Sequence, residues 1–309
     1  MRGALYVIGA VATGDPLDPV AASLSELKGA FSGVHSVGPG REISLRAFRR
    51  SFQPRDDRAL YDLTALGDHG WVISALRELP AAVLVGARSS VAPVAPLSDM
   101  RAALRYAHLG FRLPAVAAIG GLDAAPPGAN VDVALQRPAV ALAAEAPVAD
   151  AAIMIAPGAI ETAYAVLAAL RTASPRLSLI AETERDARDI RDIAASLNLD
   201  RAWVVFAQSR TEIAEAVKGA AALIDIARQP GAGLSDAGFV ARCLGATVLD
   251  LSNPTAATEA VNLITMPHSH DPARAKSFSN QRRPEDFATS LIELTDLGAR
   301  RARTAETAA

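Results

Sequence analysis

The stretch that most constrains the fold is 221–251, AALIDIARQPGAGLSDAGFVARCLGATVLDL. It begins with an apolar run, 221–227, which is interrupted only by Asp225. Such a run is typical of a strand buried on both faces of a parallel sheet. A glycine-containing turn and a short helical segment follow, and a second apolar run closes the stretch at 245–251. This pattern predicts a strand–helix–strand unit of a parallel α/β sheet.

The turn within this stretch carries small and polar residues. Gly231 and Gly233 remove side chains where the chain must turn, and Ser235 or Asp236 can cap the helix that follows by accepting hydrogen bonds from its first amides. Bare amides at a helix start, approached through glycines, suit a phosphate group, and Leu234 would supply one more amide. A nucleotide-diphosphate site and an ordinary βα turn are both open at this point.

Composition restricts the class of protein. A chain of 309 residues is long enough for two domains of about 150 residues each. With 50% hydrophobic and 21% charged residues it is globular, not disordered. A net charge of −2 gives no reason to expect nucleic acid or an anionic membrane as a partner. Only three of the 31 basic residues are lysine, which is typical of a GC-rich bacterial genome. The single cysteine, Cys243, excludes an intrachain disulfide and a cysteine-based zinc site.

The N-terminal stretch, 1–16, has an apolar part too short for a membrane span. We expect it to form the first strand, and a weak signal peptide is the alternative interpretation. The chain is therefore expected to be soluble and cytoplasmic, with no membrane span.

Candidate strands and helices alternate along both halves, which predicts two doubly wound parallel sheets. We expect an N-terminal domain over 1–125, a linker with a short strand over 126–150, a second domain over 151–283, and a terminal helix and tail over 284–309. The expected strands are 4–10, 33–37, 60–66, 81–86, 115–119, 131–135, 152–156, 177–181, 202–206, 221–227, 245–251 and 265–267. The expected helices are 18–31, 43–52, 71–79, 97–109, 161–172, 184–197, 211–218, 257–264 and 284–303, with a short one after Ser235.

The second half resembles the donor half of retaining GT-B glycosyltransferases of the family 4-like group. That half has a strand, an acidic helix ending in a Leu-Gly-Leu sequence, a second strand and helix, an apolar strand, and a glycine-containing helix start before a last strand. The matching segments here are 177–181, 197–199, 204–208, 222–227, 231–234 and 245–249. Residues 281–297 look like the closing helix of that family, and 61–86 resemble part of its acceptor domain more weakly.

This resemblance implies a GT-B-like fold of two Rossmann-type domains facing a cleft, with the acceptor side in 1–125 and the donor side in 151–283. It implies a nucleotide-diphosphate sugar as substrate, no further cofactor, and transfer of the sugar to a hydroxyl of a glycan, lipid or protein. Residues Gly231, Gly233, Leu234 and Ser235 would hold the diphosphate. Asp236 would meet a donor hydroxyl or cap the helix.

Further candidates lie at other strand ends. His69 stands in a glycine-flanked turn after an expected strand, where open α/β sheets bind ligands. With Asp68 beside it, His69 is a candidate general base toward an acceptor hydroxyl, and a loop or helix-capping histidine is the alternative. Gln208 and Arg210 follow a strand end where the family binds the nucleotide, and a solvated polar loop is the alternative for them.

The sequence departs from the family at two sets of charged residues. Retaining members carry two glutamates around the glycine turn, and alignment on Gly245 puts those positions at Ala232 and Val240. Members also carry an arginine and a lysine after the first donor-domain strand, and 155–165 contains neither. Either Arg210 or Arg228 compensates, or the donor site is degenerate. A catalytically silent GT-B-like scaffold that binds another protein, or a second copy, is the alternative function.

Other classes lack their motifs. The sequence has no GxGxxG, GxxxxGK[ST] or GxSxG motif. It therefore lacks the characteristic loops of dinucleotide dehydrogenases, P-loop NTPases and α/β-hydrolases. His268, His270 and Asp271 form a short His-rich segment, which we interpret as a solvated loop and not a metal site. A non-hydrolysing sugar epimerase, which shares the GT-B fold, is a third option.

Overall fold

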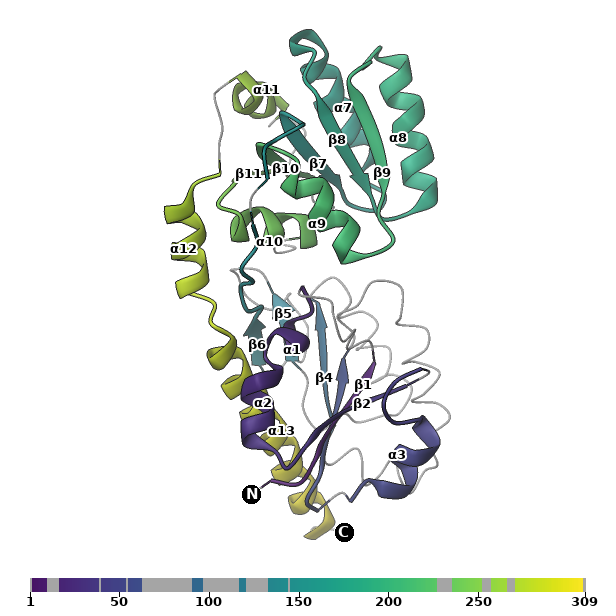
Figure 1. Ribbon diagram of the computed structural model, residues 1–309. Helices are drawn as coiled ribbons and strands as arrows, with labels where there is room; N and C mark the ends of the chain where they lie inside the picture. Colours follow the sequence, from purple (N-terminus) through teal and green to yellow (C-terminus); the bar gives the residue numbers. More distant parts are fainter. Residues whose placement is uncertain are drawn as a thin grey trace. The chain divides into compact units, whose positions relative to one another are not determined.

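The computed structural model describes residues 2–9, 17–38, 40–53, 55–62, 91–96, 117–120, 133–143, 145–226, 235–251, 257–265 and 270–307. The chain divides into two compact units (Figure 1). The first unit joins Met1–Pro138 to Arg282–Ala309, and the second is Ala139–Gln281. Each unit is built on a parallel sheet of its own.

The first unit has a six-stranded sheet in the order β2-β1-β3-β4-β5-β6. Every neighbouring pair in it is parallel. Its strands are β1 (Leu5–Gly9), β2 (Val34–Val37), β3 (Arg58–Asp62), β4 (Val91–Pro96), β5 (Ala117–Gly120) and β6 (Val133–Gln136). Its helices are α1 (Pro19–Ala22), α2 (Leu24–Ala30), α3 (Leu45–Ser51) and α13 (Pro284–Thr307).

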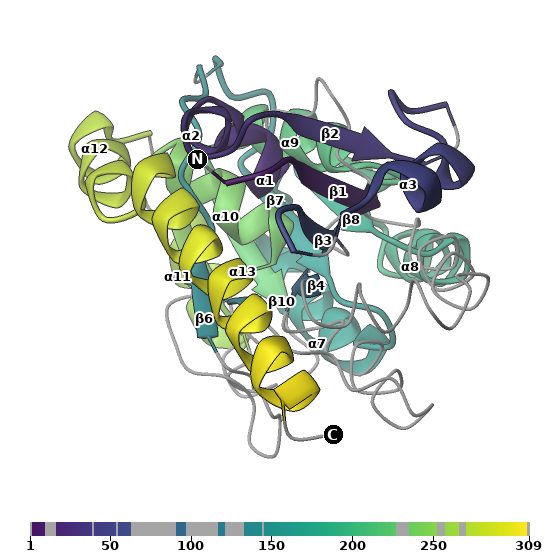
Figure 2. The ribbon, with the colours of Figure 1, turned by 90° about the horizontal axis from the view of Figure 1, so that it is seen from below.

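The terminal helix α13 completes the core of the first unit. Its apolar stripe, with Phe287, Leu291 and Leu294 all buried, packs in one cluster with side chains of β1, β3, β6 and α2. Figure 2 shows α13 running beside α2 and β6. The Arg2 guanidinium also reaches the Asp296 carboxylate on α13, with Nη2 and Oδ2 2.7 Å apart. Residues of α13 therefore belong to the same core as residues of β1.

The second unit has a five-stranded parallel sheet in the order β11-β10-β7-β8-β9. Its strands are β7 (Ala151–Ile155), β8 (Leu177–Ala181), β9 (Ala202–Phe206), β10 (Ala222–Ile226) and β11 (Thr247–Asp250). Its helices are α7 (Ile160–Leu170), α8 (Glu184–Ser196), α9 (Arg210–Lys218), α10 (Asp236–Cys243), α11 (Ala257–Thr265) and α12 (Pro272–Asn280), and a short 3₁₀ turn, η2 (Arg171–Ala173), follows α7.

Helices cover both faces of this second sheet. Apolar residues of α7, α8 and α11 form one large cluster with one face of the strands, including Ile153, Leu179 and Ile224. Helices α9 and α10 contribute nothing to that cluster, contact each other, and lie on the other face (Figure 1). This is the doubly wound arrangement that the sequence predicts, and the strand order changes direction between β7 and β10.

Several expected elements differ from the structure. The helix expected over 18–31 is two helices, because the Ser23 hydroxyl donates to the Pro19 carbonyl and competes with the helical ladder. Residues 133–136, inside the expected linker 126–150, form β6 of the first sheet. Strand β4 carries Pro93 and Pro96, which argue against a strand in sequence, and Thr265 ends α11 instead of beginning a strand. The elements expected at 71–79, 81–86 and 97–109 lie outside the described residues.

Helix α12 is an element that we did not predict. Asp271 caps it by accepting a hydrogen bond from the Ala273 amide, and Pro272 occupies its first turn. An aspartate followed by proline is a helix-start signal, so the sequence did contain the information. The solvated loop that we expected covers only 268–271, and no helix was expected over 272–280.

Gly245 provides a test of the second unit. Its φ is +73°, and a Cβ added there would overlap the Asp271 carbonyl oxygen. We expect Gly245→Ala to lower the free energy of unfolding by about 2–4 kcal/mol, measured by urea denaturation. Gly29→Ala is the control, because a Cβ on Gly29 in α2 meets no atom within 4 Å, and it should leave stability equal or higher by about 0.5–1 kcal/mol. Equal effects of the two substitutions would contradict this account of Gly245.

Candidate functional site

The candidate site lies at the carboxyl edge of the second sheet. Ligands of doubly wound proteins bind outside the carboxyl ends of the strands, near the point where the strand order reverses. Four of the predicted site residues are described there: Gln208 and Arg210 after β9, and Ser235 and Asp236 after β10. The remaining ones, which are Gly231, Gly233, Leu234, Asp68 and His69, lie outside the described residues.

Ser235 fixes the start of α10. It is the N-cap residue, and its Oγ accepts a hydrogen bond from the Gly238 amide at 3.0 Å. The same hydroxyl donates to Oδ2 of Asp225 at 2.6 Å. Of the two predicted caps, Ser235 is therefore the one used. Because it also bonds to β10, it ties the first turn of α10 to the strand that precedes it.

Asp225 is the one ionisable residue of β10, and it is 5% exposed. Burial raises the pKa of its carboxyl group to about 6, and the nearby carboxylates of Asp250 and Asp236 add to this, whereas the hydrogen bond from Ser235 opposes it. Asp250 is the register partner of Asp225 on β11. Burial also raises the pKa of Asp250, and Arg242 opposes that shift. This edge of the sheet is therefore acidic.

Arg210 connects the starts of α9 and α10. It is the first residue of α9 and is 4% exposed, and its Nε lies 3.3 Å from Oδ2 of Asp236, the first residue of α10. Strands β9 and β10 are separated in the sheet by β7 and β8. Arg210 and Asp236 meet because the helices that follow these strands, α9 and α10, contact each other. The pairing joins two predicted site residues that are 26 positions apart.

Gln208 lies in the loop that caps the start of α9. Its backbone amide donates to Oε2 of Glu212 at 2.6 Å. Glu212 and Ser209 form a reciprocal capping box at the start of α9. These contacts fix the loop after β9, and a role of Gln208 in binding stays a prediction.

The His-rich segment contributes structural contacts where it is described. His270 places Nε2 3.1 Å from the Ala220 carbonyl oxygen, and His268 lies outside the described residues. Among the residues that the structure describes, no group of three or more His, Cys, Asp or Glu side chains is arranged to hold a metal ion. Within that same part of the chain, no helix is both long and apolar enough to cross a bilayer.

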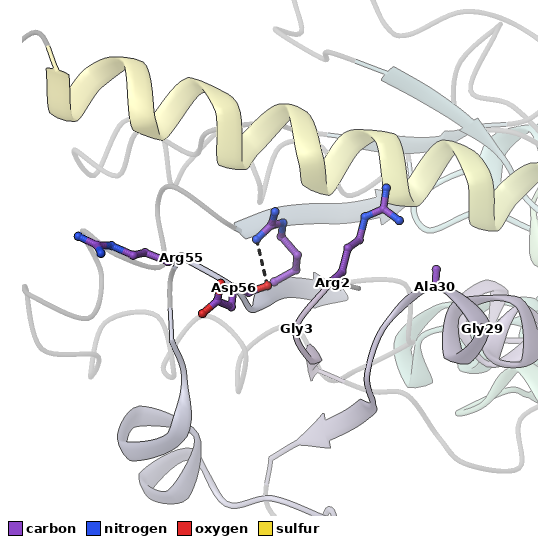
Figure 3. Close-up of a pocket in the computed structure, with 7 residues that line it drawn as sticks. Arg2, Gly3, Gly29, Ala30, Arg55 and Asp56 are labelled. Atoms are coloured by element: carbon purple, nitrogen blue, oxygen red, sulfur yellow. Dashed lines mark hydrogen bonds between the residues drawn. The ribbon is translucent and has the colours of Figure 1, made fainter.

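The first unit has a depression of about 760 Å³. It lies at the amino ends of strands, whereas the candidate site lies at the carboxyl ends of strands in the second sheet. Its lining residues are Arg2, Gly3, Gly29, Ala30, Arg55, Asp56 and Arg58, at the amino ends of β1 and β3 (Figure 3). Two of its guanidinium groups share one carboxylate, since Arg58 Nη2 lies 3.6 Å from Oδ1 of Asp296, the partner of Arg2. Arg58 also donates to the Asp56 and Asp57 carbonyls. Because these arginines already hold the first unit together, we do not place the functional site there.

The two doubly wound parallel units give the chain the fold of the GT-B glycosyltransferases. AviGT4, a glycosyltransferase involved in avilamycin A biosynthesis, superposes with a TM-score of 0.52 and 14% identity over 97% of this chain and 98% of that one. The UDP-N-acetylglucosamine 2-epimerase of Rickettsia bellii gives 0.51 and 10% over 95% and 96%. No protein-family model matches the sequence. Comparison with curated proteins finds no match.

Sequence reasoning missed two features of the site. Asp225 was visible as the one polar residue in an apolar strand, which is a signal for a buried polar contact, yet we did not assign it to the site. The acidic register pair of Asp225 and Asp250 depends on the alignment of β10 with β11. The sequence alone does not fix that register.

The raised pKa of Asp225 predicts a pH-dependent stability. Because the folded state holds this proton more tightly than the unfolded chain, whose ordinary value is 3.8, stability is lost as pH rises from about 4 to about 6. We expect wild type to lose about 2–3 kcal/mol relative to Asp225→Asn over this window, measured by urea denaturation from pH 4 to 7. Ser235→Ala removes a hydrogen bond that lowers the pKa, so it should shift the loss to higher pH. Parallel curves for wild type and Asp225→Asn would contradict the assignment.

Proposed function

We propose that this protein binds a nucleotide-diphosphate sugar and transfers the sugar to a hydroxyl group of a glycan, lipid or protein. The observation that carries the proposal is the edge of the second sheet, where α10 begins beside the reversal of strand order and Arg210 of α9 contacts Asp236, the first residue of α10. A helix start supplies amides for a phosphate but only about half a positive charge, so a diphosphate also needs a full cation. Arg210 provides one.

In this proposal the amides of Gly231, Gly233, Leu234 and Ser235 hold the diphosphate. Gln208 lies on the neighbouring loop that would face the nucleotide, and Asp236 lies next to the phosphates.

On the acceptor side, His69, with Asp68 beside it, would accept the proton of the attacking hydroxyl. The bond from the anomeric carbon to the phosphate oxygen breaks as the bond to the acceptor oxygen forms. In a retaining reaction the leaving phosphate can itself take that proton, so a strong base is not required.

The alternative is a catalytically silent GT-B-like scaffold or partner subunit. Val240 stands where the resemblance places a glutamate, and the structure shows it fully buried inside α10. The start of α7 likewise has no basic residue, and Ala159 gives it no side-chain cap. These positions cannot supply the charges that retaining members use. A sugar epimerase would have the same fold. The transferase, the scaffold and the epimerase therefore have to be distinguished by the substrate that the protein binds.

Calorimetry with uridine and guanosine diphosphates and their sugars tests the transferase proposal. We expect saturable binding of at least one of them with a Kd below about 1 mM, weakened at least about fivefold by Ser235→Ala. Thr183→Ala is the matched control, because Thr183 caps α8 in the same way, through the Asp186 amide. It should cost similar stability without changing the affinity. Absence of binding at millimolar ligand would overturn the transferase and leave the scaffold.

The proposed base is tested by turnover of any sugar donor that binds. We expect His69→Ala to lower kcat by about 100-fold while the donor affinity stays unchanged, because the residue acts on the acceptor proton. The measurement is release of nucleoside diphosphate in the presence of acceptor. Full turnover by the variant would remove His69 from the mechanism.

A further inference from the structure

The second sheet ends in a strand without the features that usually prevent pairing with another chain. Strand β9 is the last in the order β11-β10-β7-β8-β9, and among the described strands its hydrogen-bonded neighbour is β8 (Figure 1). Its sequence, AWVVF, has neither a charged residue nor a proline, whereas the opposite edge strand, β11, carries Asp250. Natural sheets commonly protect an edge strand with a charge, a proline or a bulge. An apolar edge strand favours the addition of a further strand.

The side chains of β9 are incompletely covered. The inner strands β7, β8 and β10 are buried along their whole length, whereas every residue of β9 is at least partly exposed. Ala202, Val204 and Phe206 pack against the large core cluster on one face. Trp203 and Val205 alternate with them and therefore lie on the other face, where Trp203 is 40% exposed. This end of the sheet thus leaves apolar surface in water.

The backbone groups at this edge are arranged symmetrically about Val204. The Arg201 carbonyl accepts a hydrogen bond from the first amide of β8 at 3.1 Å, and the Ala207 amide donates to the last carbonyl of β8 at 2.9 Å. In a parallel ladder the same strand bonds to its neighbour through alternate residues, so Ala202, Val204 and Phe206 direct their amides and carbonyls away from β8. Those of Val204 and Phe206 make no hydrogen bond within the part of the chain that the structure describes.

We propose that β9 binds a second copy of this chain, with the two β9 strands antiparallel about a twofold axis at Val204. In this register Val204 faces its own copy, and the outward amides and carbonyls of the two strands bond to each other. Trp203 faces Val205 of the second copy, which is a pairing of an aromatic with a β-branched side chain that stabilises sheets. All five facing positions are apolar, so no like charges meet.

A second copy fits this edge because the edge is complementary to itself. A twofold interface uses the same surface on both partners, and β9 offers the same bonding groups on either side of Val204. Helix α8, which contacts β9, carries ion pairs of both signs, Arg188–Glu184 and Arg185–Asp189, so two copies brought together do not present a single sign of charge. One pair of strands is a small interface, below about 1,200 Å², and its association is therefore weak. This inference is independent of the proposed function.

Analytical ultracentrifugation over about 1–500 µM protein tests the association. We expect a monomer–dimer equilibrium with a Kd of about 10–100 µM. Trp203→Lys/Val205→Lys should weaken it at least about tenfold, because lysines then face each other at two places. Tyr164→Lys is the matched control, since Tyr164 is a 50% exposed aromatic residue of α7 in the same unit, and it should associate as wild type.

Two outcomes of this measurement overturn the proposal. A chain that stays monomeric at about 500 µM does not pair with itself, and the edge is then left to a strand of another protein. Dimers that form equally well in wild type and in Trp203→Lys/Val205→Lys use a different surface.

Cross-linking tests the register separately, so that a loss of stability in the lysine variant does not decide the question. Facing residues that are not hydrogen-bonded to each other, as Trp203 and Val205 of the second copy are here, have Cα atoms about 4.5 Å apart, within reach of a disulfide. We expect Trp203→Cys/Val205→Cys to give a disulfide-linked dimer on a non-reducing gel after mild oxidation. Trp203→Cys alone should not, because the two Trp203 positions are diagonal and about 7–8 Å apart. The native Cys243 is buried. Equal cross-linking of the single and double variants, or none in either, contradicts the proposed register.

Discussion

Strand β10 has to bury an ionisable carboxyl group in a sheet covered by helices on both faces, and the local structure follows from how that group is held. Asp225 is held by the Ser235 hydroxyl, which at the same time caps α10. The position of α10 is thereby tied to the sheet, and its first residue meets Arg210 of α9. The Ser235 hydroxyl thus connects the start of α10 to β10, at the edge where doubly wound folds bind ligands.

At this edge the fold favours binding of a phosphate group, whereas the acidic side chains oppose it. The strand order and the capped helix start are compatible with binding of a phosphate group. However, Asp225, Asp236 and Asp250 make the same edge acidic, and Val240, where the family resemblance implies a glutamate, is buried in α10. The likeness at 14% identity concerns the fold alone, and one scaffold carries many functions.

Local patterns predicted most of the second unit. Strands 177–181 and 202–206 coincide with β8 and β9, because apolar runs bounded by polar turns leave little freedom. The sequence predicted a cap at Ser235 or Asp236, and the structure uses Ser235. The Arg210–Asp236 contact was not predicted, because it depends on how two separated strands are ordered in the sheet. In the first unit, β4 was not predicted because its prolines are unfavourable in a strand. The helix predicted over 18–31 is divided at Ser23, although its apolar spacing is continuous. These are tertiary effects that override local propensity.

The packing of α13 into the first unit makes the second unit an insertion within the first. Residues 139–281 are complete as a sheet with its helices, whereas the first unit still needs Phe287, Leu291 and Leu294. A ribosome therefore releases every described strand of both sheets before it releases the helix whose side chains join the first core. The first unit thus receives its full set of core residues only after the second unit has been synthesised, although its own synthesis begins earlier.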